Sequence, residues 1–366
     1  MVAVQNHRLG SLLANGVTSE IWSAVRLGPG GFTQDVALKT LAPYHARSPT
    51  HVRAFLHEAR AAAHVRHPNV VSTHELLDVD GRYWLSMERI VGWPLRAIGA
   101  TLALTRRRLP FEVAVAIVRD AAAGAHAIHE AGLVHRHLTP ENLMVAAAGH
   151  AVVIDFGCAS WELTEQVRFT APLDPLEPAY ASPQMLAHQR VDRRTDVYSL
   201  GAILFELCTG EAPPSVPGRS ALGVRGQGWR VGLPIGLDHV LERALDPDLP
   251  GRCESAADLA DALDRVAGRH RWHVPPSQLG GYLQAVFSGR RPAASTPPPP
   301  PPSRPPPPPS PRPRADAIEQ APTKQHRAHR PTPSGLHDAS AMRAQANPRP
   351  PTDRVKTRVR VVRKRA

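Results

Sequence analysis

Cysteine is scarce in this chain, and the three that it contains form no recognisable set. Cys158, Cys208 and Cys253 are an odd number with no metal-ligand spacing, which argues against a disulfide framework and favours a reducing compartment. The first residues carry no signal-peptide pattern, and no apolar run approaches the roughly 18 residues that cross a bilayer. These absences exclude a disulfide-rich secreted fold and predict a cytoplasmic protein without a transmembrane segment.

Lysine is nearly absent before residue 324, where Lys39 is the single example and every other basic side chain is arginine. Lys39 ends the strand-like sequence Val36-Ala37-Leu38-Lys39. An ammonium group is a compact charge that fits between phosphate oxygens and a carboxylate, where a planar guanidinium does not. The alternative is a surface lysine at a strand edge, which we disfavour because the end of a buried strand is a poor place for an idle charge.

The basic charge of the chain is concentrated at its C-terminal end. The whole chain has a formal net charge of +12, of which residues 292–366 contribute +11 and residues 1–291 only +1. Residues 292–313 contain 14 prolines, a composition that favours extended polyproline II. The polar residues that follow are expected to be disordered. The high pI therefore belongs to a tail and does not indicate a nucleic-acid-binding globular domain.

The last stretch, residues 354–366, alternates valine with basic side chains. It could lie on an anionic membrane surface, bind nucleic acid, or add a strand to the sheet of a partner. A solvated basic tail is the alternative. We expect protein partners, whose identity the sequence does not reveal, to dock on the proline-rich part of the tail.

Two short apolar segments near the middle of the chain predict a β-hairpin. Residues 143–145 and 152–154 are separated by a turn through Gly149, and this hairpin would bring Asn142 and Asp155 to adjacent strand ends. An amide oxygen beside a carboxylate suits a hard cation such as Mg²⁺, which is held by a few protein oxygens together with phosphate. The sequence therefore predicts a magnesium site between these two side chains.

The periodicity of the apolar residues changes along the chain. Residues 8–41 alternate polar and apolar positions and carry turn glycines, which is typical of a small antiparallel sheet. Helical spacing follows at 51–64, where Glu58 lies beside the apolar stripe. Three further helices are predicted, at 111–130, 196–208 and 254–266. A sheet followed by helices predicts an α+β protein with two lobes.

The motifs together resemble those of the protein kinase family, in the style of its bacterial serine/threonine members. The loop that begins His135-Arg136 and reaches Asn142, followed by the triplet 155–157 (Asp-Phe-Gly), is similar to the kinase catalytic and magnesium loops. The strand that ends at Lys39 is similar to the strand of the family that carries its phosphate-binding lysine.

The resemblance extends over residues 8–268 and implies a bilobal protein-kinase-like fold. We expect a small antiparallel-sheet N-lobe at 8–90 and a larger helical C-lobe at 91–268. A helical extension would follow at 269–291, and then a proline-rich and basic disordered tail at 292–366.

The resemblance also implies that the chain binds ATP and Mg²⁺. Lys39 would pair with Glu58 and hold the phosphates, while Asn142 and Asp155 would bind the metal ion. The residues implied to contact the nucleotide are Ala14, Gly16, Ile21, Ala37, Lys39, Glu58, Met87, Glu88, Ile90 and Met144.

Four of these residues would form the adenine site. Met87 would be the gatekeeper, and backbone groups of Glu88 and Ile90 in the hinge would bond to adenine. Met144 would lie under the ring. Residue identity is a weak signal at the hinge, because backbone groups are offered by any side chain.

The chain departs from the family pattern in two loops. Only Gly16 of the three loop glycines is present, with Ala14 and Ser19 at the other two positions. His137 stands where the family has the aspartate that accepts the hydroxyl proton, and Thr139 stands where it has a lysine that neutralises the transferring phosphoryl group. The residues that would hold nucleotide are thus largely present, and those that would act on the acceptor are altered.

Two later motifs are altered as well. Glu177 lies in the segment before the family's Ala-Pro-Glu motif, and we hypothesise that it hydrogen-bonds His137 and closes the acceptor site. Gln184 replaces the glutamate of that motif, which in the family pairs with a buried arginine. Arg252 is the candidate for this arginine.

These departures favour a pseudokinase, which would bind MgATP and signal by conformation. The alternative is a slow serine/threonine protein kinase, since a general base contributes only about 10²–10⁴-fold and a neutral histidine can accept a proton near pH 7. A scaffold that binds no nucleotide is a third possibility, because the glycine loop is eroded.

Overall fold

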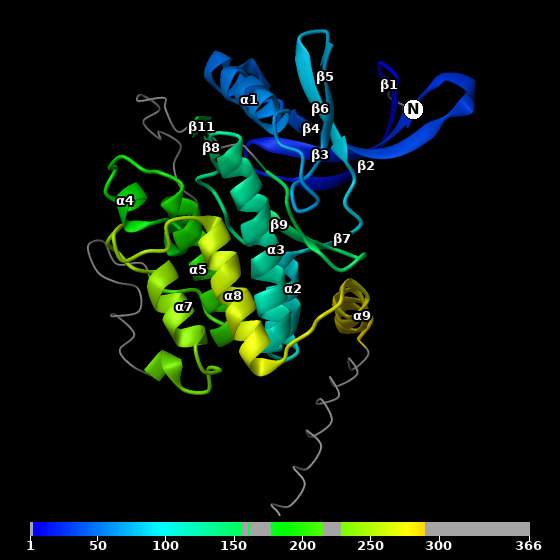
Figure 1. Ribbon diagram of the computed structural model, residues 1–366. Helices are drawn as coiled ribbons and strands as arrows, with labels where there is room; N and C mark the ends of the chain where they lie inside the picture. The colour runs from blue at the N-terminus through cyan, green and yellow to red at the C-terminus, as the bar shows by residue number, and fades with distance from the viewer. Residues whose placement is uncertain (1–2, 156–159, 162–176, 215–227, 290–366) are drawn as a thin grey trace, which may run out of the picture. The chain divides into compact units, whose positions relative to one another are not determined.

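The computed structural model describes residues 3–155, 160–161, 177–214 and 228–289 (Figure 1). In this part of the chain an antiparallel sheet precedes a helical region, so the predicted α+β bilobal fold is confirmed. The predicted tail at 292–366 lies outside the described residues. None of the helices that the structure describes combines the length and apolar character that a membrane crossing requires.

Six strands form the sheet of the N-lobe in the order β1-β2-β3-β4-β6-β5, and neighbouring strands are antiparallel. Side chains alternate between the two faces of a strand. On β4, Val36 and Leu38 pack in an apolar cluster with Trp84, so Ala37 and Lys39 face the opposite side. The strands are β1 (Ala3–Val4), β2 (His7–Asn15), β3 (Ser19–Leu27), β4 (Thr33–Leu41), β5 (Thr73–Val79) and β6 (Arg82–Glu88).

Helix α1 (Pro49–Ala62) packs on this sheet. It begins at a proline, which is tolerated at the first helical position because the N–H there has no partner within the helix. Phe55 and Ala59 contact Leu41 and Leu85 of the sheet. The predicted helix is confirmed, and both of its ends lie two residues earlier in the chain than predicted.

A short segment after α1 joins the N-lobe to strand β10 (Ala151–Val153) of the C-lobe. The N–H of Val71 donates to the carbonyl oxygen of Val153 at 2.8 Å, and the N–H of Val153 donates to that of Asn69 at 2.9 Å. The strand that leads to Asp155 is therefore bonded directly to the N-lobe.

The C-lobe is built around helices α3 and α5, which are buried along most of their length. Small side chains let α3 approach its neighbours closely, and a Cβ on Gly124 would lie 2.4 Å from the carbonyl oxygen of Asn69. All three predicted long helices are confirmed, although the last begins and ends later than expected. The helices are α2 (Leu95–Leu104), α3 (Phe111–Glu130), α4 (Pro183–Leu186), α5 (Arg194–Thr209), α7 (Leu237–Ala244) and α8 (Ala256–His270).

The predicted hairpin is confirmed as strands β9 and β10, which pair antiparallel with Leu143 opposite Val153. Gly149 lies in the turn with φ +88°, a conformation that suits glycine. Strand β7 pairs with β9 on its other side. The remaining strands and 3₁₀ turns are β7 (Gly92–Pro94), β8 (Leu133–Val134), β9 (Leu143–Ala146), β11 (Ser160–Trp161), η1 (Pro29–Gly31), η2 (His45–Arg47), η3 (Glu177–Ala179) and η4 (Gly228–Arg230).

Arg252 is almost fully buried, with 1% of its surface exposed. Its Nη2 donates to Oε1 of Gln184 at 3.0 Å, as predicted, and the guanidinium also donates to the backbone oxygens of Asp246 and Arg194. Burial lowers the pKa of Arg252 to about 10. A neutral amide therefore replaces the family's carboxylate without loss of this contact.

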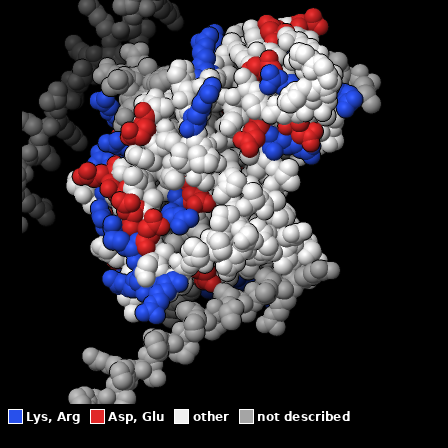
Figure 2. All heavy atoms as spheres, turned by 45° about the vertical axis from the view of Figure 1, so that its right-hand side comes forward, with Lys and Arg blue, Asp and Glu red and all other residues white. Residues whose placement is uncertain are grey.

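Acidic and basic side chains are interspersed on the face of the described chain that Figure 2 shows. This surface agrees with the net charge of only +1 over residues 1–291. An exposed ion pair such as Arg119–Asp264 at 3.5 Å contributes at most about 1 kcal/mol. Stability must therefore come mainly from the buried apolar clusters.

Helix α9 (Pro276–Phe287) packs on the turn of the β9–β10 hairpin and on β7 (Figure 1). A Cβ on Gly280 would lie 2.3 Å from the carbonyl oxygen of Ala147 in the turn. Phe287 stacks on Trp93 of β7, with ring centroids 5.3 Å apart. The close approach depends on glycine at 280.

Gly280 and Gly281 form a matched pair for testing this contact, because a Cβ on Gly281 would meet no atom within 4 Å. Gly280→Ala should destabilise the packing of α9 by about 1–3 kcal/mol, since the methyl group cannot be accommodated without a backbone shift. Gly281→Ala should instead stabilise the helix by about 0.5–1 kcal/mol. Hydrogen exchange of the α9 amides measures both, and equal effects of the same sign would contradict the packing described.

Candidate functional site

Lys39 makes two ion pairs in the interior of the protein. Its Nζ lies 2.5 Å from Oε1 of Glu58 on α1 and 2.8 Å from Oδ1 of Asp155 after β10. Lys39 and Glu58 are 5% and 6% exposed. The pair expected between Lys39 and Glu58 is therefore present, and one cation links β4, α1 and the end of the hairpin.

The two carboxylates share a single ammonium, and this sets the electrostatics of the cleft. Burial disfavours the charge on Lys39, but Asp155 and Glu58 outweigh it and raise the pKa of Lys39. Burial also raises the pKa of Glu58 to about 7, although Lys39 acts in the opposite direction. Asp155 is the more exposed carboxylate, with 30% of its side chain accessible. The deeper acid, Glu58, is thus easier to protonate than an ordinary glutamic acid.

Asn142 lies at the start of β9, beside the backbone that leads to Asp155. The N–H of Ile154 donates to the carbonyl oxygen of Asn142 at 3.0 Å. The Asn142 amide and the Asp155 carboxylate supply oxygen ligands of the kind that Mg²⁺ binds, so the residues present fit this ion. The hairpin brings the backbone of Asn142 beside the residue that precedes Asp155, and the magnesium site stays a prediction.

His137, at the family's aspartate position, contacts the predicted metal ligand. Nδ2 of Asn142 lies 2.8 Å from the carbonyl oxygen of His137 and 3.0 Å from its ring Nδ1. Thr139 is buried, with 3% of its surface exposed, and its carbonyl oxygen accepts from the N–H of Asn142 at 3.0 Å. His137 and Thr139 therefore both contact Asn142, the residue expected to bind the metal ion.

The loop before His137 is held by Asp196 at the start of α5, a residue to which sequence analysis assigned no role. The Asp196 carboxylate accepts from the N–H of His135 at 2.8 Å, from that of Arg136 at 2.7 Å and from Nε2 of His129 at 2.8 Å. Arg136 has φ +65°, a strained conformation that such bonds stabilise. The sequence signal that could have identified Asp196 is a single aspartate in the first turn of a helix that is otherwise apolar and buried.

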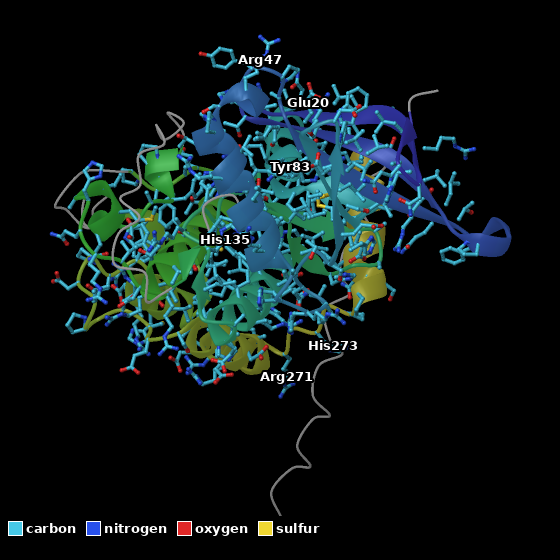
Figure 3. All side chains as sticks on the ribbon, turned by 90° about the horizontal axis from the view of Figure 1, so that it is seen from above. Glu20, Arg47, Tyr83, His135, Arg271 and His273 are labelled. Carbon is cyan, nitrogen blue, oxygen red and sulfur yellow. The ribbon has the colours of Figure 1, made fainter. Side chains whose placement is uncertain are left out.

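Asp196 and His135 are both completely buried, and His135 lies near the centre of the molecule when it is viewed from above (Figure 3). Burial alone would raise the pKa of Asp196, but the hydrogen bond and charge of His129 and the bond from His135 outweigh it and lower that pKa. Burial lowers the pKa of His135. The ionised carboxylate is therefore a fixed acceptor for the loop.

Arg96 on α2 joins a second network that sequence analysis missed. Its guanidinium donates to both carboxylate oxygens of Glu141, at 2.5 and 3.1 Å, next to Asn142 in the chain. It also lies 3.3 Å from the hydroxyl of Tyr180, which donates to Glu206 at 2.5 Å. Burial and the bond to Glu206 raise the pKa of Tyr180. The network ties the loop to α2 and α5.

The residues expected around the nucleotide lie on neighbouring strands. Ile21 on β3 is opposite Lys39, and Ala37 on β4 is opposite Met87 on β6. Ala37 and Met87 are 7% and 5% exposed. The register therefore pairs Met87, the expected gatekeeper, with Ala37, and Ile21 with Lys39.

The residues expected to form the hinge begin with Glu88, the last residue of β6. The N–H of Glu88 donates to the carbonyl oxygen of Ser72 at 2.8 Å, and Ile90 is partly buried against the main core. Met144 on β9 is opposite Pro94 of β7, the strand that leaves the hinge. The expected floor residue is thus attached to the hinge through the β7–β9 pairing.

The glycine loop is the turn between β2 and β3. Ala14 is opposite Ile21 in the register, and the N–H of Gly16 donates to the carbonyl oxygen of Ser19 at 2.9 Å. Leu13 on β2 is 46% exposed. The turn is therefore hydrogen-bonded although Ala14 and Ser19 stand at two of the family's glycine positions.

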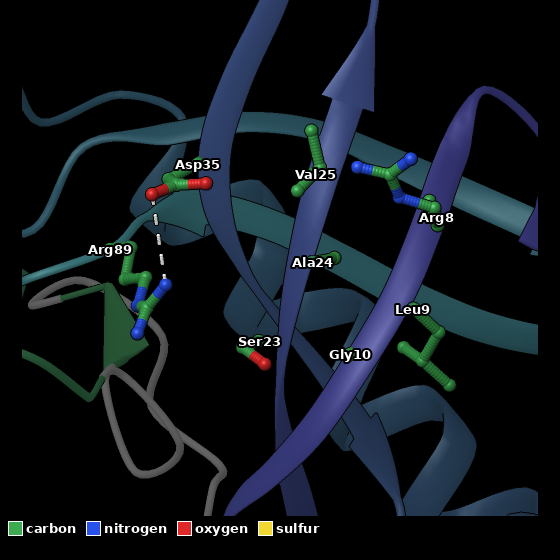
Figure 4. A pocket seen from close by; sticks show the side chains of 8 residues that line it. All are labelled: Arg8, Leu9, Gly10, Ser23, Ala24, Val25, Asp35 and Arg89. Carbon is green, nitrogen blue, oxygen red and sulfur yellow. Dashed lines mark ion pairs between the residues drawn. The ribbon is translucent and has the colours of Figure 1, made fainter.

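A hollow of about 390 Å³ lies between β2, β3 and the start of β4, with Arg89 on its wall (Figure 4). Asp35 is two residues before Ala37 and shares its face of the strand. It forms an ion pair with Arg89 at 3.7 Å on one wall, and Arg8 reaches over the other side. The hollow therefore adjoins the expected adenine site but is not part of it.

Two expectations fall outside the described residues. Phe156 and Gly157 of the Asp-Phe-Gly triplet are among the residues not described. The same holds for the side chain of Glu177, so its proposed hydrogen bond to His137 stays a prediction.

Comparison with known proteins assigns the chain to a family. The family described as Protein kinase domain matches residues 9–222, more than half of the 366 residues. The chain belongs to the protein kinase family. The use of ATP and Mg²⁺ is what membership implies.

Named relatives agree with the predicted resemblance to bacterial kinases, which is confirmed. The chain is 33% identical over 298 residues to the tyrosine-protein kinase MasK of Myxococcus xanthus, covering 76% of this chain and 46% of that protein. It is 32% identical over 277 residues to the serine/threonine-protein kinase PknB of Mycobacterium leprae, covering 71% and 43%. The chain thus spans less than half the length of these two relatives.

Solved structures agree as well. The crystal structure of the PknI kinase domain of Mycobacterium tuberculosis is 27% identical, with a TM-score of 0.56, and the match covers 73% of this chain and 98% of that one. The similarity in fold therefore extends over a complete kinase domain.

Replacing Lys39 tests the electrostatics of the cleft. In Lys39→Met the buried Glu58 loses its cation, which should cost up to about 3 kcal/mol of folding free energy. The folded pKa of this carboxyl lies above its unfolded value, so the penalty is absent below the unfolded pKa and grows as pH rises through about 7. Urea unfolding should therefore show a larger loss at pH 8 than at pH 6.

Arg60→Met, on the exposed side of α1, is the matched control. It also removes one positive charge but should leave stability within about 0.5 kcal/mol at both pH values. A Lys39→Met loss that is independent of pH would contradict the shared-ammonium description.

Proposed function

We propose that the chain is a pseudokinase that binds ATP with Mg²⁺ and acts in signalling through nucleotide-dependent conformation. The observation that carries the proposal is the buried contact of Lys39 with both Glu58 and Asp155, retained next to a loop in which His137 and Thr139 replace the reactive residues. The chain thus keeps the residues that hold the phosphates in the family and lacks the residues that act on the acceptor hydroxyl.

Three features of the chain support nucleotide binding. An ammonium for the phosphates is supplied by Lys39, oxygen ligands for the metal by Asn142 and Asp155, and a hinge follows β6. The proposed nucleotide contacts are those implied by the family: Ala14, Gly16, Ile21, Ala37, Lys39, Glu58, Met87, Glu88, Ile90 and Met144. Loss of two loop glycines should weaken the grip on the phosphates, since backbone N–H groups close over them there.

The acceptor side rests on what the loop lacks. A general base contributes about 10²–10⁴-fold to a transfer reaction. The family's lysine two positions later neutralises the transferring group, and the buried Thr139 carries no charge to do so. The two losses need not add, but together they favour transfer that is slower by several orders of magnitude.

A slow protein kinase is the second candidate function. Phosphoryl transfer depends mainly on positioning and electrostatics, and the support of the loop by Asp196 is complete. The type of hydroxyl that would accept the phosphate is also part of this proposal, because the named relatives include a tyrosine kinase and a serine/threonine kinase. On the basis of the similarity to PknB, we propose a serine or threonine hydroxyl as the acceptor.

A pair of assays on the purified full chain separates the candidates. MgATP should raise the melting temperature of the wild type and leave that of Lys39→Met unchanged, because the variant has no ammonium for the phosphates. Transfer of the γ-phosphate to a generic protein substrate should stay at background. Brisk transfer that requires Lys39 would overturn the pseudokinase proposal, and absence of both signals would leave only a scaffold.

Restoring the two loop residues tests the acceptor side. His137→Asp combined with Thr139→Lys should raise the rate of transfer by at least about 100-fold, the lower end of the contribution of a general base. Thr139→Lys alone is the control, because it adds the charge without the base. A wild-type rate equal to that of the double variant would show that neither replacement limits the reaction.

A further inference from the structure

The side-chain amide of Asn142 is held by His137 through two contacts to the same atom. Nδ2 lies 2.8 Å from the carbonyl oxygen of His137 and 3.0 Å from its ring Nδ1. A carbonyl oxygen can only accept, so the atom of the amide that faces it must be the NH₂ group. The Oδ1 atom, which is the metal ligand, is therefore turned to the opposite side of the amide.

The same contact assigns the protonation of the ring. The NH₂ group donates and cannot accept, so Nδ1 of His137 must present a lone pair to it. A neutral imidazole with Nδ1 unprotonated carries its hydrogen on Nε2. In this state the second ring nitrogen is a donor, and it offers no lone pair to take a proton from an acceptor hydroxyl.

We propose that His137 is a positioning residue for the metal-binding amide of Asn142 and not a replacement base. Its Nδ1 lone pair, together with its carbonyl oxygen, holds the amide in the orientation that would present Oδ1 of Asn142 to Mg²⁺. The inference rests on the proposed binding of MgATP and adds to it a role for the residue that replaced the family's aspartate.

Backbone contacts separate this role from a structural one. The loop around Asn142 is held by the bond from its N–H to the oxygen of Thr139 and by the bond from Ile154 to its own carbonyl oxygen, both 3.0 Å. Neither bond involves the ring of His137, which is only half-buried. Removing the ring should therefore leave the amide held by the carbonyl oxygen alone, and loosen it without unfolding the loop.

Three substitutions separate the ring acceptor from the bulk of the side chain. His137→Asn places an oxygen at the position of Nδ1, His137→Gln places it one bond further out, and His137→Ala removes it. The readout is the affinity for ATP with Mg²⁺ divided by the affinity with EDTA, measured by calorimetry. This ratio reports the metal contribution, which a general loss of stability does not change.

The ratio should fall in His137→Ala by about two- to tenfold, the contribution of one neutral hydrogen bond. His137→Asn should retain the wild-type ratio, and His137→Gln should behave as His137→Ala. His239→Ala on α7, an imidazole with 72% of its side chain exposed, is the control and should change nothing. A wild-type ratio in folded His137→Ala overturns the proposal, and if that variant does not fold, equal ratios for His137→Asn and His137→Gln do so.

A second measurement needs neither metal nor nucleotide. Nitrogen-15 chemical shifts of the His137 ring in the full chain, at pH 8, should show Nδ1 unprotonated and Nε2 protonated. A hydrogen on Nδ1 would overturn the inference whatever the binding data show. Failure of the wild type to bind MgATP would count against the proposed function, and the ring shifts would still decide the contact between His137 and Asn142.

Discussion

One ammonium group shared by two carboxylates is the constraint on which the cleft depends. Lys39 reaches from β4 to Glu58 on α1 and to Asp155 after β10, so the sheet, the helix and the hairpin meet at a single cation. A buried charge without a partner would cost several kcal/mol. This requirement makes the position intolerant of a larger guanidinium, in a region whose other basic residues are all arginine.

The loop that contains His137 and Thr139 is held through backbone atoms, whereas its expected reactive groups are side chains. Asp196 holds the loop through the backbone N–H groups of His135 and Arg136, and these bonds do not depend on the side chains at 137 and 139. The reactive residues of the family could therefore be exchanged while the loop kept its course. The loop therefore has this backbone support with His137 and Thr139 at those two positions.

Much of the fold could be predicted because the apolar residues of its helices and strands recur with the period of each element. Helix α3 has the bounds predicted for it, and α1 is displaced by only two residues. Helix α8 runs to His270, four residues beyond its predicted end, because it stops at Arg271 in the left-handed conformation. No sequence signal marks an arginine for that conformation, so the end of this helix could not be predicted.

The candidate site was readable where a residue's type already limits its chemistry. A lone lysine on a strand and an asparagine and an aspartate flanking a hairpin indicated phosphate and metal binding. The roles of Asp196 and Arg96 were not readable, because each acts on residues at least 40 positions away in the chain. The roles of the histidines could not be predicted from the sequence either, since an imidazole can be a donor, an acceptor or a base.

The sequence by itself determined which groups the cleft contains: one ammonium, two carboxylates, one amide, and a histidine in place of an aspartate. Chemical identity is a local property, and the order of the motifs was enough to place these groups near one another. Only the tertiary structure decided how they are used. The carbonyl oxygen and ring nitrogen of His137 both face Nδ2 of Asn142, and the direction of a hydrogen bond depends on the positions of atoms that the sequence does not specify.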